Sequence, residues 1–184
     1  MFSHSKIKNM TMLKPIAFLI LIVCTNFVVT ECRTIQPNDE NLIQQICKKT
    51  PNYALCIQYL HSDPKAPSAD VRGLALIMVN VMKNKANIAI NKIHQLIGKS
   101  PPDQKEALDN CADNYNAIAV ADIPEATEAL LKGNPKFAED GANDAVVEAR
   151  GCENGFKGKS PLTAENNAMR DASAITAAIV RNLL

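Results

Sequence analysis

The sequence predicts an all-α protein: an up-down four-helix bundle with an N-terminal helical hairpin. Beyond residue 41, apolar residues recur at steps of three and four, which is the spacing of one helix face. The alternating apolar and polar residues that mark a strand are not found, even beside Asp140-Gly141, a dipeptide typical of hairpin turns. Four apolar stripes of this kind cover one another in a four-helix bundle.

The first 30 residues have the composition of a secretory signal peptide. Three lysines precede an uncharged apolar run over residues 15–29, and small or polar residues follow it. A membrane-spanning helix is the alternative, but it needs about 20 apolar residues, and Asn26 lies inside this run. We therefore expect cleavage after Thr30, or as late as Cys32, and no stable membrane association of the remaining domain, residues 31–184.

Residues 42–59 predict two short helices that form the hairpin. Their apolar positions are Leu42, Ile43 and Ile46 in the first helix and Tyr53, Leu55 and Tyr59 in the second. Thr50-Pro51-Asn52 lies between them and is a turn signal.

Two long helices are expected next. The first runs from about Ser68 to Gly98, because glycine is common just after a helix end. The second begins with Ser100 as its N-cap and a proline in its first turn, and runs to about Leu130. Pro124 should kink the second helix, since proline lacks a backbone N–H and clashes with the carbonyl four residues earlier.

Two further helices complete the predicted bundle. Residues 133–141 interrupt the helical pattern, and a shorter helix is expected from there to about Gly151. The last helix begins at Ser160-Pro161, and its apolar stripe continues to the C-terminus.

Four of the six cysteines belong to the expected mature domain: Cys47, Cys56, Cys111 and Cys152. In a secreted protein an even set of four indicates two disulfides, for which three pairings exist. The turn at Pro51 favours the local pair Cys47–Cys56, which leaves Cys111–Cys152 to join the second and third bundle helices. A zinc site is the alternative, but the C-x2-C spacing is absent and no histidine lies close in sequence to either pair.

Charge and motifs argue against nucleic-acid binding and against catalysis. The formal net charge is +1, and no block of about five or more like charges occurs. Gly158-Lys159-Ser160 resembles the end of a P-loop, but Glu153 stands where that motif needs glycine. His61 and His94 do not stand in an H-E-x-x-H motif, and Glu139-Asp140 is interpreted as a solvated pair. We therefore expect no enzyme activity, no cofactor and no metal.

Several short motifs, in their order along the chain, resemble the plant invertase and pectin methylesterase inhibitor family. They are Asn52-Tyr53, Leu55-Cys56, residues 74–79, Asn110-Cys111-Ala112, Pro124-Glu125-Ala126, residues 135–141 and residues 178–184. The resemblance covers residues 41–184 and is greatest to the inhibitors of cell-wall and vacuolar invertase. It implies the same bundle, the same two disulfides and no enzymatic activity.

The resemblance also implies a binding site for a target enzyme, acid invertase, in a one-to-one complex. In the family, a Pro-Lys-Phe motif in the loop after the second long helix enters the invertase active site, and here it is Pro135-Lys136-Phe137. Pectin methylesterase inhibitors generally lack this tripeptide, so their function is the alternative on the same fold. Secretion to the apoplast or cell wall is expected, and the vacuole is the second destination.

The chemistry of the tripeptide suits that role. A retaining glycosidase carries two carboxyl groups about 5 to 5.5 Å apart, between which the Lys136 ammonium would be attracted. Pro135 would limit the flexibility of the loop, and Phe137 would fill an adjoining apolar subsite. The simpler interpretation is an ordinary turn in which Lys136 is solvated and Phe137 covers the core. A bundle that binds a small apolar ligand is a further alternative and requires an internal cavity.

Overall fold

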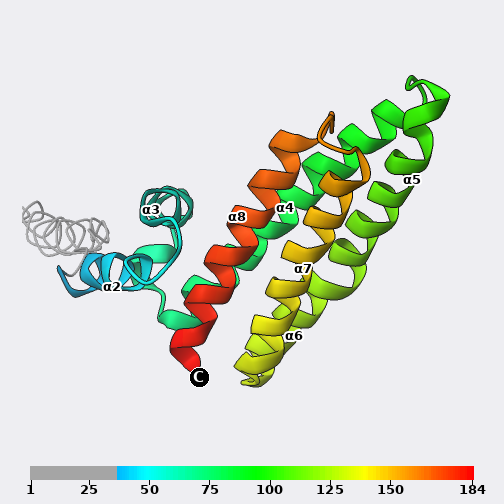
Figure 1. The fold of residues 1–184 in the computed structure, drawn as a ribbon. Coiled ribbons are helices and arrows are strands. Elements are labelled where there is room, and N and C mark those ends of the chain that lie inside the picture. The colour runs from blue at the N-terminus through cyan, green and yellow to red at the C-terminus, as the bar shows by residue number, and fades with distance from the viewer. Residues whose placement is uncertain (1–36) are drawn as a thin grey trace, which may run out of the picture. The chain divides into compact units, whose positions relative to one another are not determined.

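The computed structural model describes residues 37–184, so the predicted signal peptide and its cleavage positions lie outside the described residues. Within 37–184 every regular element is helical, which confirms the predicted fold class (Figure 1). None of the helices in this part of the chain is both long and apolar enough to cross a membrane.

The N-terminal hairpin consists of α2 (Pro37–Cys47) and α3 (Tyr53–His61). The side chain of Asn52 caps α3 by accepting a hydrogen bond from the Leu55 N–H at 3.1 Å. The predicted disulfide Cys47–Cys56 joins the two helices and is confirmed.

The first bundle helix, α4 (Val71–Ile97), begins three residues later than predicted. A 3-10 turn, η1 (Ala66–Ser68), occupies the predicted start. The side chain of Asp70 then caps α4 by accepting from the Gly73 N–H at 2.7 Å. The predicted end at Gly98 is confirmed.

The second predicted helix is divided into α5 (Pro102–Ala117), the π-helical segment η2 (Ile118–Asp122) and α6 (Ile123–Lys132). The Ile123 N–H donates to the Ile118 carbonyl, five residues earlier. This wider turn lies directly before Pro124, whose ring would clash with a carbonyl in regular α-helical register. Ser100 is not the N-cap as predicted, because Pro101 holds that position without a side-chain hydrogen bond.

The third bundle helix, α7 (Pro135–Gly155), corrects two predictions. The expected interruption over residues 133–141 is wrong, and the helix continues past Gly151. Gly141 does not break the helix, because its role is close packing: a Cβ there would lie 2.7 Å from the Asp122 carbonyl oxygen. A glycine required by a neighbouring helix therefore has the appearance of a helix breaker in the sequence.

The last bundle helix, α8 (Thr163–Val180), ends in the 3-10 turn η3 (Arg181–Leu183). It begins later than the predicted Ser160-Pro161. The Ser160 hydroxyl accepts from the Leu162 N–H at 3.1 Å, so Ser160 stabilises the preceding turn and does not cap the helix.

The four rods of the bundle run up and down in chain order (Figure 1). Helix α4 packs on α8 and on the α5–α6 rod, and α7 packs on the same two neighbours from the other side. The second predicted disulfide, Cys111–Cys152, is confirmed and links α5 to α7. The core between the rods is filled mainly by aliphatic side chains, together with Tyr115.

The hairpin packs on the bundle through apolar residues such as Leu60 and also through two polar interactions. The Lys49 ammonium donates to the Asn182 side chain at 2.7 Å, near the C-terminus. The Lys85 ammonium of α4 lies 5.2 Å from the centre of the Tyr59 ring, within cation–π range.

Candidate functional site at the turn between α6 and α7

The connection from α6 to α7 is a tight turn of two residues, Gly133 and Asn134. Gly133 ends α6 with φ of 78°, a left-handed conformation that favours glycine. The Asn134 N–H donates to the Ala129 carbonyl, five residues earlier, at 2.8 Å. This hydrogen bond and the left-handed glycine together form a Schellman motif, which defines the backbone of the turn.

The predicted tripeptide does not lie in a loop, and this is a correction. Pro135, Lys136 and Phe137 form the first turn of α7, with Pro135 at the first helical position, where its missing N–H costs nothing. The Phe137 N–H donates to the Asn134 carbonyl at 3.2 Å. The three side chains are therefore presented by a helical backbone and not by a flexible loop.

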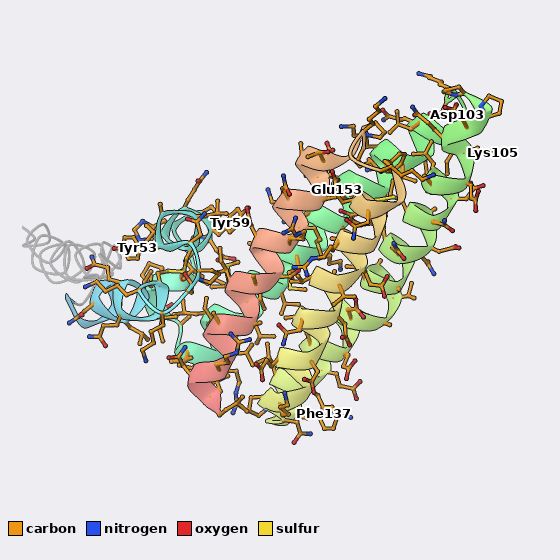
Figure 2. The ribbon with its side chains drawn as sticks, in the orientation of Figure 1. Tyr53, Tyr59, Asp103, Lys105, Phe137 and Glu153 are labelled. Carbon is orange, nitrogen blue, oxygen red and sulfur yellow. A yellow bond between two sulfur atoms is a disulfide. The ribbon has the colours of Figure 1, made fainter. Side chains whose placement is uncertain are left out.

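Phe137 projects from the bundle and is not part of the core. Its side chain is 57% exposed, and Figure 2 labels it at the end of the bundle where α6 meets α7. The alternative that Phe137 covers the core is therefore wrong. A large apolar side chain that is exposed beside a cation is available for contact with another molecule.

Lys136 is exposed but paired. Its ammonium donates to Asp140 at 2.8 Å and to Glu139 at 3.1 Å, and its side chain is 63% exposed. The hydrogen bond to Asp140, followed by that to Glu139, raises the pKa of Lys136 above its usual value. Because Lys136 also lies at the positive end of the α7 dipole, and the first turn of α7 holds no acidic residue, this end of the helix attracts anions.

Glu139 is buried against this surface and was not identified as part of the site by the sequence. Its second oxygen accepts from the Arg181 Nε at 2.6 Å. That hydrogen bond, followed by the one from Lys136, holds the pKa of Glu139 below its usual value. The interpretation of Glu139-Asp140 as a solvated pair is thus wrong for Glu139. Arg181 is 42 residues away in the chain, and no local pattern links the two.

A small hollow of about 100 Å³ lies beside Pro135. Arg72, Leu130, Gly133 and Leu183 complete its lining, so α4, α6 and the C-terminal turn all meet at this end of the bundle. The surface near the tripeptide thus has a shallow depression next to an exposed cation and an exposed aromatic ring.

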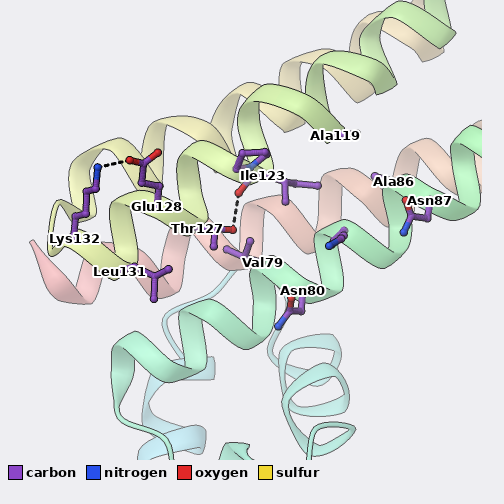
Figure 3. A pocket seen from close by; sticks show the side chains of 12 residues that line it. Val79, Asn80, Ala86, Asn87, Ala119, Ile123, Thr127, Glu128, Leu131 and Lys132 are labelled. Carbon is purple, nitrogen blue, oxygen red and sulfur yellow. Dashed lines mark hydrogen bonds and ion pairs between the residues drawn. The ribbon is translucent and has the colours of Figure 1, made fainter.

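A larger groove of about 540 Å³ lies between α4 and the η2–α6 segment (Figure 3). Val79, Ile123 and Leu131 form part of its apolar lining, while Glu128 and Lys132 form an ion pair at its rim. The groove opens to solvent, unlike the enclosed cavity that binding of a small apolar ligand would require.

The sequence predicts neither a catalytic nor a metal-binding role for His94. His94 lines a small hollow on the surface between α4 and α5 with Asn116. Among the described residues, no group of three or more His, Cys, Asp or Glu side chains is placed to hold a metal ion.

Comparison with known proteins identifies relatives over nearly the whole described chain. The sequence profile of the plant invertase/pectin methylesterase inhibitor family matches residues 41–183. The chain is 46% identical over 142 residues to cell wall / vacuolar inhibitor of fructosidase 1 of Arabidopsis thaliana, covering 77% of this chain and 69% of that protein. It is 31% identical over 121 residues to a pectinesterase inhibitor of Actinidia deliciosa, covering 65% of each chain.

A solved structure supports the fold. The crystal structure of a mutant form of a pectin methylesterase inhibitor from Arabidopsis superposes with a TM-score of 0.67 at 24% identity. The superposition covers 76% of this chain and 95% of that one. At this identity the likeness extends to the helical bundle alone.

Proposed function

The chain belongs to the plant invertase/pectin methylesterase inhibitor family, and on that premise we propose that it is a secreted inhibitor of acid invertase. The family consists of inhibitors and not of enzymes. In the proposed complex Pro135, Lys136 and Phe137 enter the active site of one invertase molecule. Because one turn occupies one site, the proposed stoichiometry is one to one.

The observation that carries the proposal is the exposed Lys136 ammonium at the start of α7. Retaining glycosidases stabilise a developing cation between two carboxyl groups about 5 to 5.5 Å apart. An ammonium on a projecting turn carries the positive charge that the carboxyl groups of such a site stabilise. In the free protein Lys136 already bonds two carboxylates, Glu139 and Asp140, so the enzyme would replace one pair of anionic partners with another.

The turn is also well ordered for insertion. The Schellman motif at Gly133 and the proline at the start of α7 leave the backbone little freedom to lose on binding. Phe137 follows directly and supplies an exposed ring that would act as an apolar anchor.

The alternative target is pectin methylesterase, since a relative at 31% identity is named as a pectinesterase inhibitor. The 46% identity to a relative named as an inhibitor of fructosidase favours invertase. For location, we propose secretion to the apoplast or cell wall, with the vacuole as the second destination, because both routes begin with a signal peptide such as the one predicted over residues 1–30.

Inhibition assays on the purified mature domain test the proposal. The domain should inhibit cell-wall invertase, vacuolar invertase or both, and should leave pectin methylesterase active. Lys136→Ala should weaken invertase inhibition by roughly 30-fold to several thousand-fold, because enzyme carboxylates would face an empty, desolvated pocket.

Lys132→Ala is the matched control. Lys132 is as exposed as Lys136 and forms an ion pair with Glu128, four residues away on α6, but it precedes the turn. This variant should inhibit within about threefold of the parent, because exposed ion pairs contribute little. A Lys136→Ala protein that inhibits invertase as strongly as the parent would refute the proposed mechanism, and inhibition of pectin methylesterase alone would refute the proposed target.

A further inference from the structure

We propose that Arg181 is a positioning residue for inhibition: by binding Glu139, it allows the Lys136 ammonium to leave its own carboxylates and enter the target site. The inference rests on the proposed function. It assigns a role to the C-terminal turn, which has no part in the tripeptide itself.

The geometry is that of one carboxylate shared between two cations. Arg181 Nε lies 2.6 Å from Glu139 Oε1, and Lys136 Nζ lies 3.1 Å from Glu139 Oε2. Arg181 therefore makes the shorter hydrogen bond, and Lys136 makes the longer one to the oxygen that remains. The Glu139 side chain is only 11% exposed, so its charge needs a partner in both the free and the bound protein.

This sharing decides how easily Lys136 is released. Insertion into an enzyme site requires the ammonium to leave both Asp140 and Glu139. Asp140 is half exposed, and water can replace Lys136 there. Glu139 is largely hidden from water, and without Arg181 the departure of Lys136 would leave it as an unpaired buried charge.

The fold brings Arg181 to this position from a distant part of the chain. Arg181 opens η3, directly after the last residue of α8, while Glu139 lies in the second turn of α7. Because α7 and α8 are packed neighbours, the end of α8 lies beside the start of α7. Figure 1 shows the C-terminus at the same end of the bundle as the turn between α6 and α7.

Inhibition constants against acid invertase test the inference with three variants. Arg181→Gln should weaken inhibition by about three- to tenfold, since Glu139 would then bind Lys136 more strongly. The double variant Arg181→Gln/Glu139→Gln should inhibit at least as strongly as the parent, because the competing charge is gone. Arg181→Lys, which keeps a cation within reach of Glu139, should stay within about threefold of the parent.

Lys132→Gln is the matched control for a general loss of positive charge. Lys132 is the last residue of α6, next to the turn at the same end of the bundle, but its ammonium pairs with Glu128 and not with Glu139. This variant should inhibit within about threefold of the parent. An equal loss in Lys132→Gln and Arg181→Gln would overturn the inference in favour of long-range attraction.

A titration of the free inhibitor tests the same idea without any enzyme. In an NMR titration of isotopically dimethylated lysines, Arg181→Gln should raise the pKa of Lys136, whereas Lys132→Gln should leave it near the parent value. An unchanged Lys136 titration in Arg181→Gln would overturn the inference.

The outcomes separate this inference from the proposed function. If Lys136→Ala loses inhibition while Arg181→Gln inhibits like the parent, the inference is wrong and the proposed function stands. If the double variant is as weak as Arg181→Gln alone, the role of Glu139 is refuted. If the parent protein inhibits no invertase, the proposed function fails together with the inhibitory role of Arg181.

Discussion

Helix α7 carries a glutamate near each end, and the two have different partners. Near the start of the helix, Glu139 accepts hydrogen bonds from two cations, Arg181 and Lys136. Near the end, Glu153 accepts from the Thr163 hydroxyl and from the Asn166 amide, each at 2.7 Å. Figure 2 labels Glu153 and Phe137 toward opposite ends of the bundle.

One partner of Glu153, Asn166, is held in the core, whereas Thr163 is exposed. Asn166 is fully buried and accepts a hydrogen bond from the buried Tyr115 hydroxyl at 2.9 Å. Burial is the main cause that raises the pKa of Tyr115 above its usual range, so its hydroxyl remains a donor. Cys152, the residue before Glu153, is bonded to Cys111.

The difference separates a structural carboxylate from an exchangeable one. Glu153 accepts from neutral donors, and through the buried Asn166 and Tyr115 side chains this network joins α7 to α8 and α5. Ion pairs with exposed cations can be exchanged for those of another molecule at little cost. We therefore expect changes at the Glu153 end to reduce stability, and changes at the Lys136 end to reduce inhibition.

Removal of the Cys111–Cys152 disulfide should have the largest effect on stability. The double variant Cys111→Ala/Cys152→Ala should lower the free energy of unfolding by about 2 to 5 kcal/mol, because this bond closes a long loop. Urea unfolding measures the change, and inhibition by the folded fraction should be preserved. Removal of Cys47–Cys56, which spans only 9 residues, is the control and should cost less. Equal losses in the free energy of unfolding would show that the link between α5 and α7 stabilises the fold no more than the hairpin disulfide does.

Asn166→Ala should disrupt the buried network. The substitution leaves both the Tyr115 hydroxyl and a Glu153 oxygen without a partner, which should cost about 1 to 3 kcal/mol of stability. Inhibition constants measured below the melting temperature should not change. Asn167→Ala, at the exposed neighbouring position, should leave both quantities near the parent values. A loss of inhibition in a stably folded Asn166→Ala protein would contradict the separation of the two ends.

Phe137→Ala should produce the reverse pattern. Loss of an exposed anchor should weaken invertase binding by about 1 to 3 kcal/mol. Because Phe137 is 57% exposed, the melting temperature should stay close to that of the parent. Calorimetry on the same preparations provides both values. A lowered melting temperature with unchanged inhibition would assign Phe137 to stability.

Asp122 offers a third kind of carboxylate, one with a buried oxygen that has no hydrogen bond. It is buried in η2, and its Oδ2 has no hydrogen bond. Burial, followed by the charges of Asp144, Glu148 and Glu125, raises its pKa to about 7. A raised pKa in the folded state means that the stabilisation is present at low pH and is lost as the pH rises toward and through 7.

The effect of Asp122 should be the smallest of the series, about 1 kcal/mol or less after solvent screening. Stability of the parent should fall between pH 5 and pH 8, and Asp122→Asn should reduce that slope. Urea midpoints across this range provide the test, with Asp144→Asn as a control that removes only a neighbouring charge. Identical slopes in the parent and Asp122→Asn would exclude Asp122 as their cause.

Local pattern was sufficient for the fold class, for the bounds of α4 and for the Cys47–Cys56 disulfide. The stripe of α4 repeats over many turns, so its bounds were predicted to within three residues at the start and at Gly98 at the end. The Cys47–Cys56 pairing followed from a turn signal between two short apolar segments. The tripeptide at Lys136 came from the resemblance, since an Asn-Pro turn has no distinctive physical signal of its own.

The tertiary structure decided what depends on neighbours distant in sequence. Gly141 was expected to belong to an interruption, yet α7 runs through it. The residue is a glycine because a side chain there would collide with the Asp122 carbonyl. The expected loop at Pro135 is a helical turn for a local reason, because α7 begins as soon as Gly133 has reversed the chain.

The electrostatic environment of the site likewise required the fold. Periodicity and composition describe each segment by itself, so they predicted the helical class and most of the helices but not the continuous α7. The Arg181–Glu139 hydrogen bond joins residues on two packed helices, and only their packing determines that the two charges meet. The sequence therefore identified the Lys136 cation, whereas the tertiary structure decided which carboxylates hold it and how readily it is released.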